Sequence, residues 1–419
     1  MKTRPDACFI ADDLSGALEV GSLFKDQGHP VRLDINPSSP APPAGSILGY
    51  DLNTRQTTED RAYGEVHALV TEIRKRHNRL FYKKIDSTLR GWISEEIRAV
   101  LDADPDCIVF FCPANPVVGR TVHDGRLLVD GTPVDETPFN RDPAFPITDA
   151  RIAARFRPGL RKLLRHCPLT TVRDSETVRA KWIDQSLREG GRIVSFDAVT
   201  ETDLVALARA ARSLSHPVLL CGSGALAGAI YRADPDGCAK EPARNPPPIR
   251  PDGIGVGFLI GSAHPRTHEQ FELLRRERSL EVVVFDPTDP PSWSRPLNEF
   301  GAMCQRGPVA VVPRVTGPPE RDTSAAIQTF FRRLAGRTEP EPLPDRLFVT
   351  GGETARTVID AIPVDSLDLS GSLEPGVAVA LAQRSSAMPG MTHVLTVVTK
   401  PGGFGGPNTL VQCYDYLTA

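Results

Sequence analysis

The sequence predicts an α/β protein built from two domains, each with a mostly parallel sheet flanked by helices. Short apolar runs alternate with amphipathic stretches along most of the chain, as they do when helices join the strands of a parallel sheet. At about 150 residues per domain, 419 residues suggest two or three domains. A proline-rich stretch at 241–251 interrupts the alternation, and strand and helix patterns resume after it.

The first half of the chain contains short apolar runs that predict strands, at residues 7–11, 31–35, 46–50, 80–84 and 107–111. Amphipathic stretches predict helices between them, at residues 15–28, 58–77 and from about 94. Gly28 is a typical helix end. The helix that begins at Thr58 has acidic residues in its first turn and basic residues in its last, which suits the helix dipole. The alternation continues with a strand at 192–198, a helix at 203–214 and a strand at 216–224.

Five prolines stand among the eleven residues 241–251. Proline cannot donate a ladder hydrogen bond and favours stiff, extended chain, so we expect a linker here. The sequence therefore predicts an N-terminal domain at 1–240 and a C-terminal domain at 252–419. In the second domain a strand, a helix and a strand are expected, at residues 255–263, 269–280 and 280–286.

The composition argues against several classes of protein. Lys plus Arg number 49 and Asp plus Glu 52, so the net charge of −3 offers no basic footprint for nucleic acid or an anionic membrane. Five apolar residues precede two aspartates at the N-terminus, too few for a signal peptide, and no run approaches ~18 apolar residues. The eight cysteines include no C-x-x-C pair, which excludes a zinc knuckle. These features predict a cytoplasmic protein with no nucleic-acid or membrane partner.

Two carboxylates, Asp12 and Asp13, stand where the first strand ends and a helix begins. In open α/β sheets ligands bind at this carboxyl edge. Either aspartate could take a hydroxyl proton, bind Mg²⁺ or hydrogen-bond a polyol. The alternative is that one caps the helix and the other is solvated.

The segment KKIDSTLRG, residues 83–91, also follows a strand. It combines cations suited to a carboxylate or phosphate with oxygen acceptors suited to hydroxyls, namely Lys83, Lys84, Asp86, Ser87 and Arg90. A solvated loop is the alternative. The polar loop 113–143 follows the next strand and is long enough to be functional, with Arg120 as a candidate ligand contact. Its Asp-Gly pair within LLVDGTPV predicts a hairpin.

Three glycine-rich turns in the second domain each follow an apolar run, at residues 261–267, 349–355 and 399–406. Backbone amides of such turns can converge on phosphate oxygens, so three of them together indicate a nucleotide site. The chain has no G-x-x-x-x-G-K-[ST] motif and is not a P-loop protein. The stretch GSGALAG, residues 222–228, imitates a dinucleotide fingerprint, but its spacing favours close strand-to-helix packing.

Taken in order, DDLSGA, LNTR, YKKIDSTLRG, PANPVVGRTVHDG, GGET and KPGGFGG resemble the motifs of the four-carbon acid sugar kinase family over nearly the whole chain. The resemblance implies two domains with the active site in the cleft between them, the first binding a sugar acid and the second ATP. It also implies ATP-dependent phosphorylation of a terminal hydroxyl on threonate, erythronate or a 3-oxo-tetronate, with Mg²⁺ as the metal. Ser15 stands where the family usually has Thr, and the exact acid stays open.

The resemblance places substrate contacts on Asp12, Arg55 and residues 83–87. It places the ATP contacts in the C-terminal domain, on Ser262, Gly351, Gly352, Glu353, Thr354, Gly402, Gly403 and Gly405. We expect Arg55 to hold the substrate carboxylate, since its guanidinium can engage two oxygens. Asp12 is the expected general base and Asp86 its rival. Metal ligands and oligomeric state stay open. The competing hypotheses are a nicotinamide-dependent oxidoreductase and a non-catalytic nucleotide or sugar-acid sensor.

Overall fold

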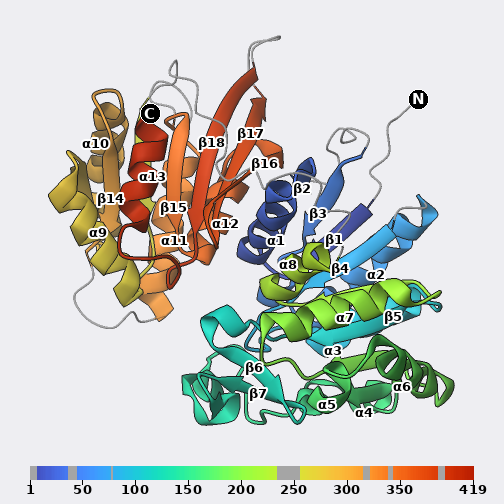
Figure 1. Cartoon of the computed structure of the whole chain (residues 1–419). Coiled ribbons are helices and arrows are strands. Elements are labelled where there is room, and N and C mark those ends of the chain that lie inside the picture. Colours follow the sequence, from blue (N-terminus) through green and yellow to red (C-terminus); the bar gives the residue numbers. More distant parts are fainter. Residues whose placement is uncertain are drawn as a thin grey trace. The chain divides into compact units, whose positions relative to one another are not determined.

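The computed structural model divides the chain into two compact units (Figure 1). Unit 1 comprises residues 1–29 and 41–241, and unit 2 comprises residues 30–40 and 242–419. The structure describes residues 7–35, 45–76, 79–233, 255–314, 321–337, 343–385 and 392–419. The linker predicted at 241–251 lies outside these residues. Each unit has a β-sheet with helices, so the predicted α/β class is confirmed.

Unit 1 contains a seven-membered run of parallel strands in the order β3-β1-β4-β11-β5-β10-β9. Its strands are β1 (Ala7–Ala11), β3 (Ile47–Asp51), β4 (Arg79–Lys84), β5 (Ile108–Cys112), β9 (Leu164–Cys167), β10 (Ile193–Phe196) and β11 (Val218–Gly222). Its helices are α1 (Leu14–Asp26), α2 (Glu59–Lys75), α3 (Ile93–Ala103), α4 (Pro158–Arg161), α5 (Leu169–Val172), α6 (Glu176–Arg188), α7 (Glu201–Ser213) and α8 (Gly224–Arg232).

The helices of unit 1 fall into two groups around the sheet. Helix α8 packs against both α1 and α7, whereas α2 packs against α3 (Figure 1). Strands β1 and β4 are neighbours, and helix α1 follows β1 while helix α3 follows β4. Because crossovers between parallel strands are right-handed, these two helices lie on opposite faces of the sheet. Such a reversal opens a crevice beyond the carboxyl ends of the two strands, which is where open α/β sheets bind ligands.

A small second sheet lies within the long segment that follows β5. Its strands are β6 (Arg120–His123), β7 (Arg126–Val129) and β8 (Thr132–Pro133), and short 3₁₀ helices accompany them at Pro116–Val118, Val134–Glu136, Pro138–Arg141 and Ile152–Arg155. Asp130 and Gly131, with φ of 50° and 81°, form the turn between β7 and β8, so the predicted hairpin is confirmed. Asp124 and Gly125 make a second turn of this kind, which we did not predict.

The sheet of unit 2 has the order β13-β14-β12-β15-β18-β17-β16-β2, and the pairings from β13 to β18 are parallel. Its strands are β2 (Val31–Asp34), β12 (Val256–Ile260), β13 (Glu281–Phe285), β14 (Val309–Pro313), β15 (Arg346–Thr350), β16 (Val364–Glu374), β17 (Val377–Ser385) and β18 (Thr392–Lys400). Its helices are α9 (Pro265–Glu277), α10 (Ser294–Cys304), α11 (Arg321–Ala335), α12 (Gly352–Ala361) and α13 (Thr409–Thr418), with a 3₁₀ helix at Pro290–Trp293.

The strands β16, β17 and β2 add an antiparallel part to this sheet that the sequence did not predict. Strand β2 lies within the predicted N-terminal domain by sequence, yet it pairs with β16 and belongs to unit 2. The guanidinium Nε of Arg32 on β2 lies 2.7 Å from the Asp368 carboxylate on β16. The partner of β2 therefore lies more than 300 residues away, where no local pattern can indicate it.

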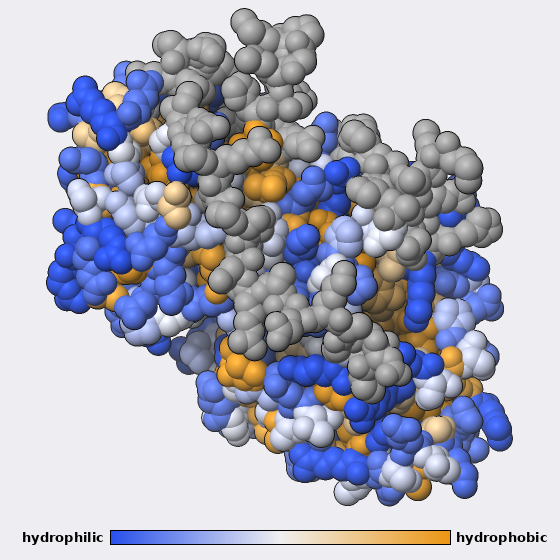
Figure 2. Space-filling view, turned by 45° about the horizontal axis from the view of Figure 1, so that its top comes forward, coloured by the Kyte–Doolittle hydropathy of each residue, from blue (hydrophilic) through white to orange (hydrophobic). Residues whose placement is uncertain are grey.

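Apolar side chains fill the space between the sheets and helices. In unit 2 the rings of Phe258 and Phe348 lie 5.5 Å apart, and Leu274 and Leu410 belong to the same buried cluster. Burying one such side chain contributes roughly 1.5–3 kcal/mol. On the face drawn in Figure 2, hydrophilic residues predominate and hydrophobic ones form small interspersed patches. Among the described residues, no helix combines the length and apolar character needed to cross a bilayer.

Candidate functional site

Three neighbouring parallel strands of unit 1 bring charged side chains to one edge of the sheet. Asp12 and Asp13 follow β1, and Asp86 follows β4. Arg55 lies in a 3₁₀ helix, Thr54–Gln56, directly after β3, and its backbone N–H donates to the Asp12 carbonyl at 3.2 Å. Because the carboxyl ends of neighbouring parallel strands coincide, residues distant in sequence meet at the predicted crevice.

The Arg55 guanidinium joins these carboxylates. Its Nε and Nη2 donate to the Asp12 carboxylate at 2.9–3.1 Å, and its Nη1 donates to Asp13 at 3.1 Å. The Asp86 carboxylate lies 4.0 Å from the same Nη1. The structure therefore brings together Asp12, Arg55 and Asp86, which the sequence singled out separately.

Asp13 caps helix α1. Its Oδ1 accepts a hydrogen bond from the Gly16 backbone N–H at 2.9 Å, and its backbone is extended, as is usual for an N-cap residue. The capping alternative is thus confirmed for one of the two aspartates. The other, Asp12, is only 1% exposed and makes its carboxylate contacts with Arg55.

The carboxylates of Asp12 and Asp86 differ in proton affinity. Burial raises the pKa of Asp12, Arg55 lowers it and Asp13 raises it again, so that the pKa reaches about 6. Burial would also raise the pKa of Asp86, but Arg55, Arg90 and Thr88 outweigh burial and hold that pKa well below its usual range. Carboxylates whose pKa values are pushed apart can divide the roles of proton acceptor and permanent anion.

Both lysines of β4 are buried and form ion pairs. The Lys83 ammonium lies 2.9 Å from Glu96, with each side chain 1% exposed, and the Lys84 ammonium lies 3.3 Å from Glu19. A direct contact between Lys83 and a substrate, which the sequence predicts, would require this pair to open. Neither glutamate was predicted from the sequence. Glu96 stands between Ile93 and Ile97 on the apolar face of α3, and a charge in such a position indicates a buried partner.

The long segment after β5 packs on the loop that carries Asp86. Arg90 holds Asp86 at 2.9–3.0 Å, lies 3.5 Å from the Asp142 carboxylate and stacks over the Phe139 ring at 5.7 Å. Ser87 is half-buried in the same loop. The described side-chain contact of Arg120 is with the Val118 carbonyl of its own loop. The structure therefore joins Arg90, rather than Arg120, to the charged cluster.

The three glycine-rich turns of unit 2 follow neighbouring strands. Ser262 comes after β12, Gly351 to Thr354 after β15, and Gly402 to Gly405 after β18. Helix α9 follows β12 and helix α12 follows β15. Because crossovers are right-handed, these two helices lie on opposite faces of the sheet. The glycine turns therefore stand at a point where the strand order reverses, as the charged residues do in unit 1.

These turns also contact one another directly. The Gly351 N–H donates to the Lys400 carbonyl at 2.9 Å, and the Thr267 hydroxyl donates to the Gly402 carbonyl at 2.9 Å. A side chain at Gly402 would collide with the Ser262 hydroxyl. Gly351 has φ of 99°, which favours glycine. All eight residues predicted for ATP therefore lie on these turns or in the first turn of α12, at one edge of the sheet.

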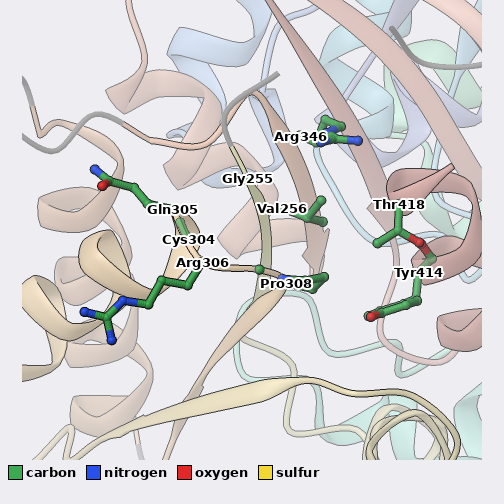
Figure 3. A pocket seen from close by; sticks show the side chains of 10 residues that line it. Gly255, Val256, Cys304, Gln305, Arg306, Pro308, Arg346, Tyr414 and Thr418 are labelled. Carbon is green, nitrogen blue, oxygen red and sulfur yellow. The ribbon is translucent and has the colours of Figure 1, made fainter. Parts of the chain in front are cut away.

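A cavity of about 390 Å³ lies elsewhere in unit 2 (Figure 3). It is lined by Gly255 and Val256 at the start of β12, by Arg346 at the start of β15, and by Tyr414 and Thr418 of α13. These strand positions are amino ends, whereas the glycine turns follow carboxyl ends. The cavity is therefore separate from the candidate nucleotide site.

The described residues contain no group of three or more His, Cys, Asp or Glu side chains arranged to hold a metal ion. A Mg²⁺ ion that binds ATP takes most of its ligands from phosphate and water, with one or two protein carboxylates. The carboxylates of Asp12 and Asp13 have the oxygen chemistry that such an ion prefers.

Two family models match the chain. Residues 7–230 match a sugar-binding N-terminal domain, and residues 258–410 match a nucleotide-binding C-terminal domain. A D-threonate kinase of Cupriavidus necator is 30% identical, with 98% of this chain and 97% of the relative covered. A D-erythronate kinase of Heliobacterium modesticaldum is 25% identical (97% and 96% covered), and a 3-oxo-tetronate kinase of Brucella melitensis is 27% identical (94% and 92% covered).

The fold also resembles a solved structure, that of a Haemophilus influenzae protein of the family DUF1537. The TM-score is 0.73 at 21% sequence identity, over 98% of both chains. At that identity the likeness confirms the fold alone.

Proposed function

The chain belongs to the four-carbon acid sugar kinase family, and we propose that it transfers the terminal phosphoryl group of ATP to the terminal hydroxyl of a four-carbon sugar acid. The names of its relatives make threonate, erythronate and 3-oxo-tetronate the candidate substrates. Neither the nicotinamide-dependent oxidoreductase nor the non-catalytic sensor is favoured by these relatives.

The observation that carries the proposal is the division of chemistry between the two units. At its ligand-binding edge, unit 1 has a half-buried arginine among carboxylates, the groups that a hydroxylated anion needs. Unit 2 has glycine turns at the corresponding edge of its own sheet, and these suit phosphate. We therefore assign the sugar acid to unit 1 and the nucleotide to unit 2.

In the proposed reaction Asp12 takes the proton of the substrate hydroxyl. The hydroxyl oxygen forms a bond to the γ-phosphorus while the bond from that phosphorus to its bridging oxygen breaks, and ADP keeps the electron pair. Arg55 orients Asp12 and binds the substrate carboxylate, and Asp86 stays ionised and holds Arg55 and Arg90. Mg²⁺, which we propose arrives with ATP, would neutralise charge on the phosphates.

The proposal is tested by incubating the purified chain with ATP, Mg²⁺ and each of D-threonate, D-erythronate and 3-oxo-tetronate. We expect ADP release with at least one acid, at a rate well above that of ATP hydrolysis without acid. Reduction of a nicotinamide cofactor by the same acids, with no ADP release, would instead support the oxidoreductase.

The pH dependence of kcat/KM should report the proton affinity of Asp12. With a pKa of about 6, Asp12 is ionised above this value and protonated below it, and only the ionised form can accept the hydroxyl proton. We therefore expect kcat/KM to rise about tenfold per pH unit up to about pH 6 and then to level off. A limb centred near pH 4 would point to a carboxylate with an unshifted pKa and contradict the assignment.

Replacing Arg55 with lysine should weaken binding of the sugar acid. One edge of the guanidinium holds Asp12 while Nη1 faces Asp13 and Asp86, and these Nη1 contacts are the ones that a substrate carboxylate would replace. The ammonium group of lysine cannot bind Asp12 and a substrate carboxylate at the same time in this way. KM for the acid should therefore rise roughly tenfold or more, and KM for ATP should stay within about twofold.

The matched control is Arg278→Lys. Arg278 also forms a two-point pair with an aspartate, Asp415, at 2.7 and 2.8 Å, on the surface of unit 2. This variant should leave both KM values unchanged. If Arg55→Lys changed KM for the acid and KM for ATP equally, Arg55 would not be the residue that binds the substrate carboxylate.

A further inference from the structure

Lys400 is a buried cation at the start of the third glycine turn. It is the last residue of β18, and its side chain is 1% exposed. The ammonium donates to three backbone carbonyls of the turn that follows, those of Pro401 at 3.1 Å, Gly402 at 3.0 Å and Phe404 at 3.2 Å. An ammonium group has three N–H donors, so this cage uses all of them.

The cage determines where the amides of the turn point. In a planar trans peptide, the carbonyl of one residue and the N–H of the next point in opposite directions. Carbonyls of residues 401, 402 and 404 that face Lys400 therefore turn the N–H groups of Gly402, Gly403 and Gly405 away from it. Within the described part of the chain, none of these three N–H groups has a protein acceptor.

Neutral side chains hold the same turn from helix α9. Thr267 donates to the Gly402 carbonyl at 2.9 Å, and the Gln270 amide donates to the carbonyls of Phe404 and Gly406 at 3.1 and 2.7 Å. Lys400 differs from them because its donors are charged and meet at one point. Hydrogen bonds from a charged donor are roughly twice as strong as neutral ones.

We propose that Lys400 is a positioning residue for the nucleotide: by drawing three carbonyls inward, it presents the amides of Gly402, Gly403 and Gly405 to the phosphates of ATP. This role rests on the proposed kinase function and deepens it. Lys400 does not itself contact phosphate, since its three donors are occupied within the chain.

The environment of Lys400 makes this role dependent on pH. Burial lowers the pKa of Lys400, Cys413 and Glu374 raise it and Arg266 lowers it, and together these effects bring the pKa to about 8. A neutral amine has two N–H donors in place of three, so one carbonyl of the cage loses its donor above this pH. The phosphates of ATP are fully ionised by then, because their last pKa is on the order of 6.

The wild-type chain provides the first test, as the dissociation constant of ATP measured by equilibrium titration without sugar acid. We expect this constant to rise roughly tenfold between pH 7 and pH 9.5, the cost of losing one charge-assisted hydrogen bond. Adenosine, which has no phosphate, should bind with a constant that does not change. The free energy of unfolding should instead increase over this range. Between about pH 8 and pH 10.5 the unfolded chain still holds the Lys400 proton that the folded chain has lost, so folding becomes more favourable as the pH rises.

Lys400→Met provides the second test, with Thr267→Val as the matched control on the same turn. Lys400→Met removes all three donors, so at pH 7 it should bind ATP at least tenfold more weakly than the wild type and show no further weakening up to pH 9.5. Thr267→Val should keep the wild-type pH dependence, because its lost donor does not titrate. Both should bind adenosine as the wild type does.

The outcomes separate this inference from the proposed function. Failure of the wild type to bind ATP at any pH would overturn the kinase proposal itself. ATP binding that is independent of pH in the wild type, or unchanged in a folded Lys400→Met, would overturn only the role of Lys400. If Lys400→Met does not fold, the pH dependence of ATP binding by the wild type, with adenosine as the reference, decides the matter.

Discussion

Replacing Asp12 with asparagine should lower kcat by roughly 10²–10⁴-fold, the usual cost of removing a general base. Asparagine has the same shape and keeps an oxygen for Arg55, but it cannot accept the hydroxyl proton. Asp12 suits this task because its pKa of about 6 lies near neutral pH, whereas Asp86 holds its negative charge too firmly to be a good base. The measurement is kcat with saturating acid and ATP at pH 7.5.

Three comparisons accompany this variant. Asp13→Asn should lose less than tenfold, because asparagine caps a helix as well as aspartate does. The dissociation constant of ATP should be the same for Asp12→Asn and the wild type. Near-normal kcat in Asp12→Asn together with a large loss in Asp86→Asn would move the base to the loop after β4.

Asp12→Asn is expected to fold. Because the pKa of Asp12 is raised from 3.8 to about 6, the folded chain binds more protons than the unfolded chain between these values. The free energy of unfolding that Asp12 contributes therefore falls as the pH rises through this window. The loss of activity in Asp12→Asn should thus appear without a loss of cooperative unfolding.

Replacing Lys83 with methionine should lower the free energy of unfolding by about 3–5 kcal/mol. Lys83 and Glu96 are each 1% exposed and lie 2.9 Å apart, and Thr54 also donates a hydrogen bond to Glu96. Removing only the cation leaves an uncompensated carboxylate in the interior of unit 1. Urea unfolding at pH 7 measures the change.

Two variants make this prediction specific. Lys75→Met removes an exposed cation that lies 4.0 Å from Glu72 on α2, and it should change stability by less than about 0.5 kcal/mol. The double variant Lys83→Met/Glu96→Leu removes both charges and should recover most of the loss, because well-packed apolar residues often replace a buried ion pair at little cost. A single variant as stable as the wild type would show that the pair contributes nothing to the fold.

Several features of this protein could be predicted locally. The run ACFIA predicts a strand at residues 7–11, and β1 has these bounds. The Asp130–Gly131 turn and the helix after Thr58 were likewise predicted, because turn residues and helix caps act on their immediate neighbours. The position of each glycine turn, directly after an apolar run that forms a strand, also indicated a nucleotide site.

What the tertiary structure alone decided are the partners of the charged groups. Asp12 and Arg55 are 43 residues apart in the sequence, and Arg32 and Asp368 are 336 residues apart. Lys83 lies on a strand and Glu96 on the helix that follows it. The sequence shows that these charges exist, but the proton affinity of a buried group depends on its burial and on the charges around it, which are set by the packing of distant segments. The chemistry available to the chain was therefore visible in its residue types. The opposite pKa shifts of Asp12 and Asp86, and the cage around Lys400, arise only when each sheet brings the ends of its own strands together.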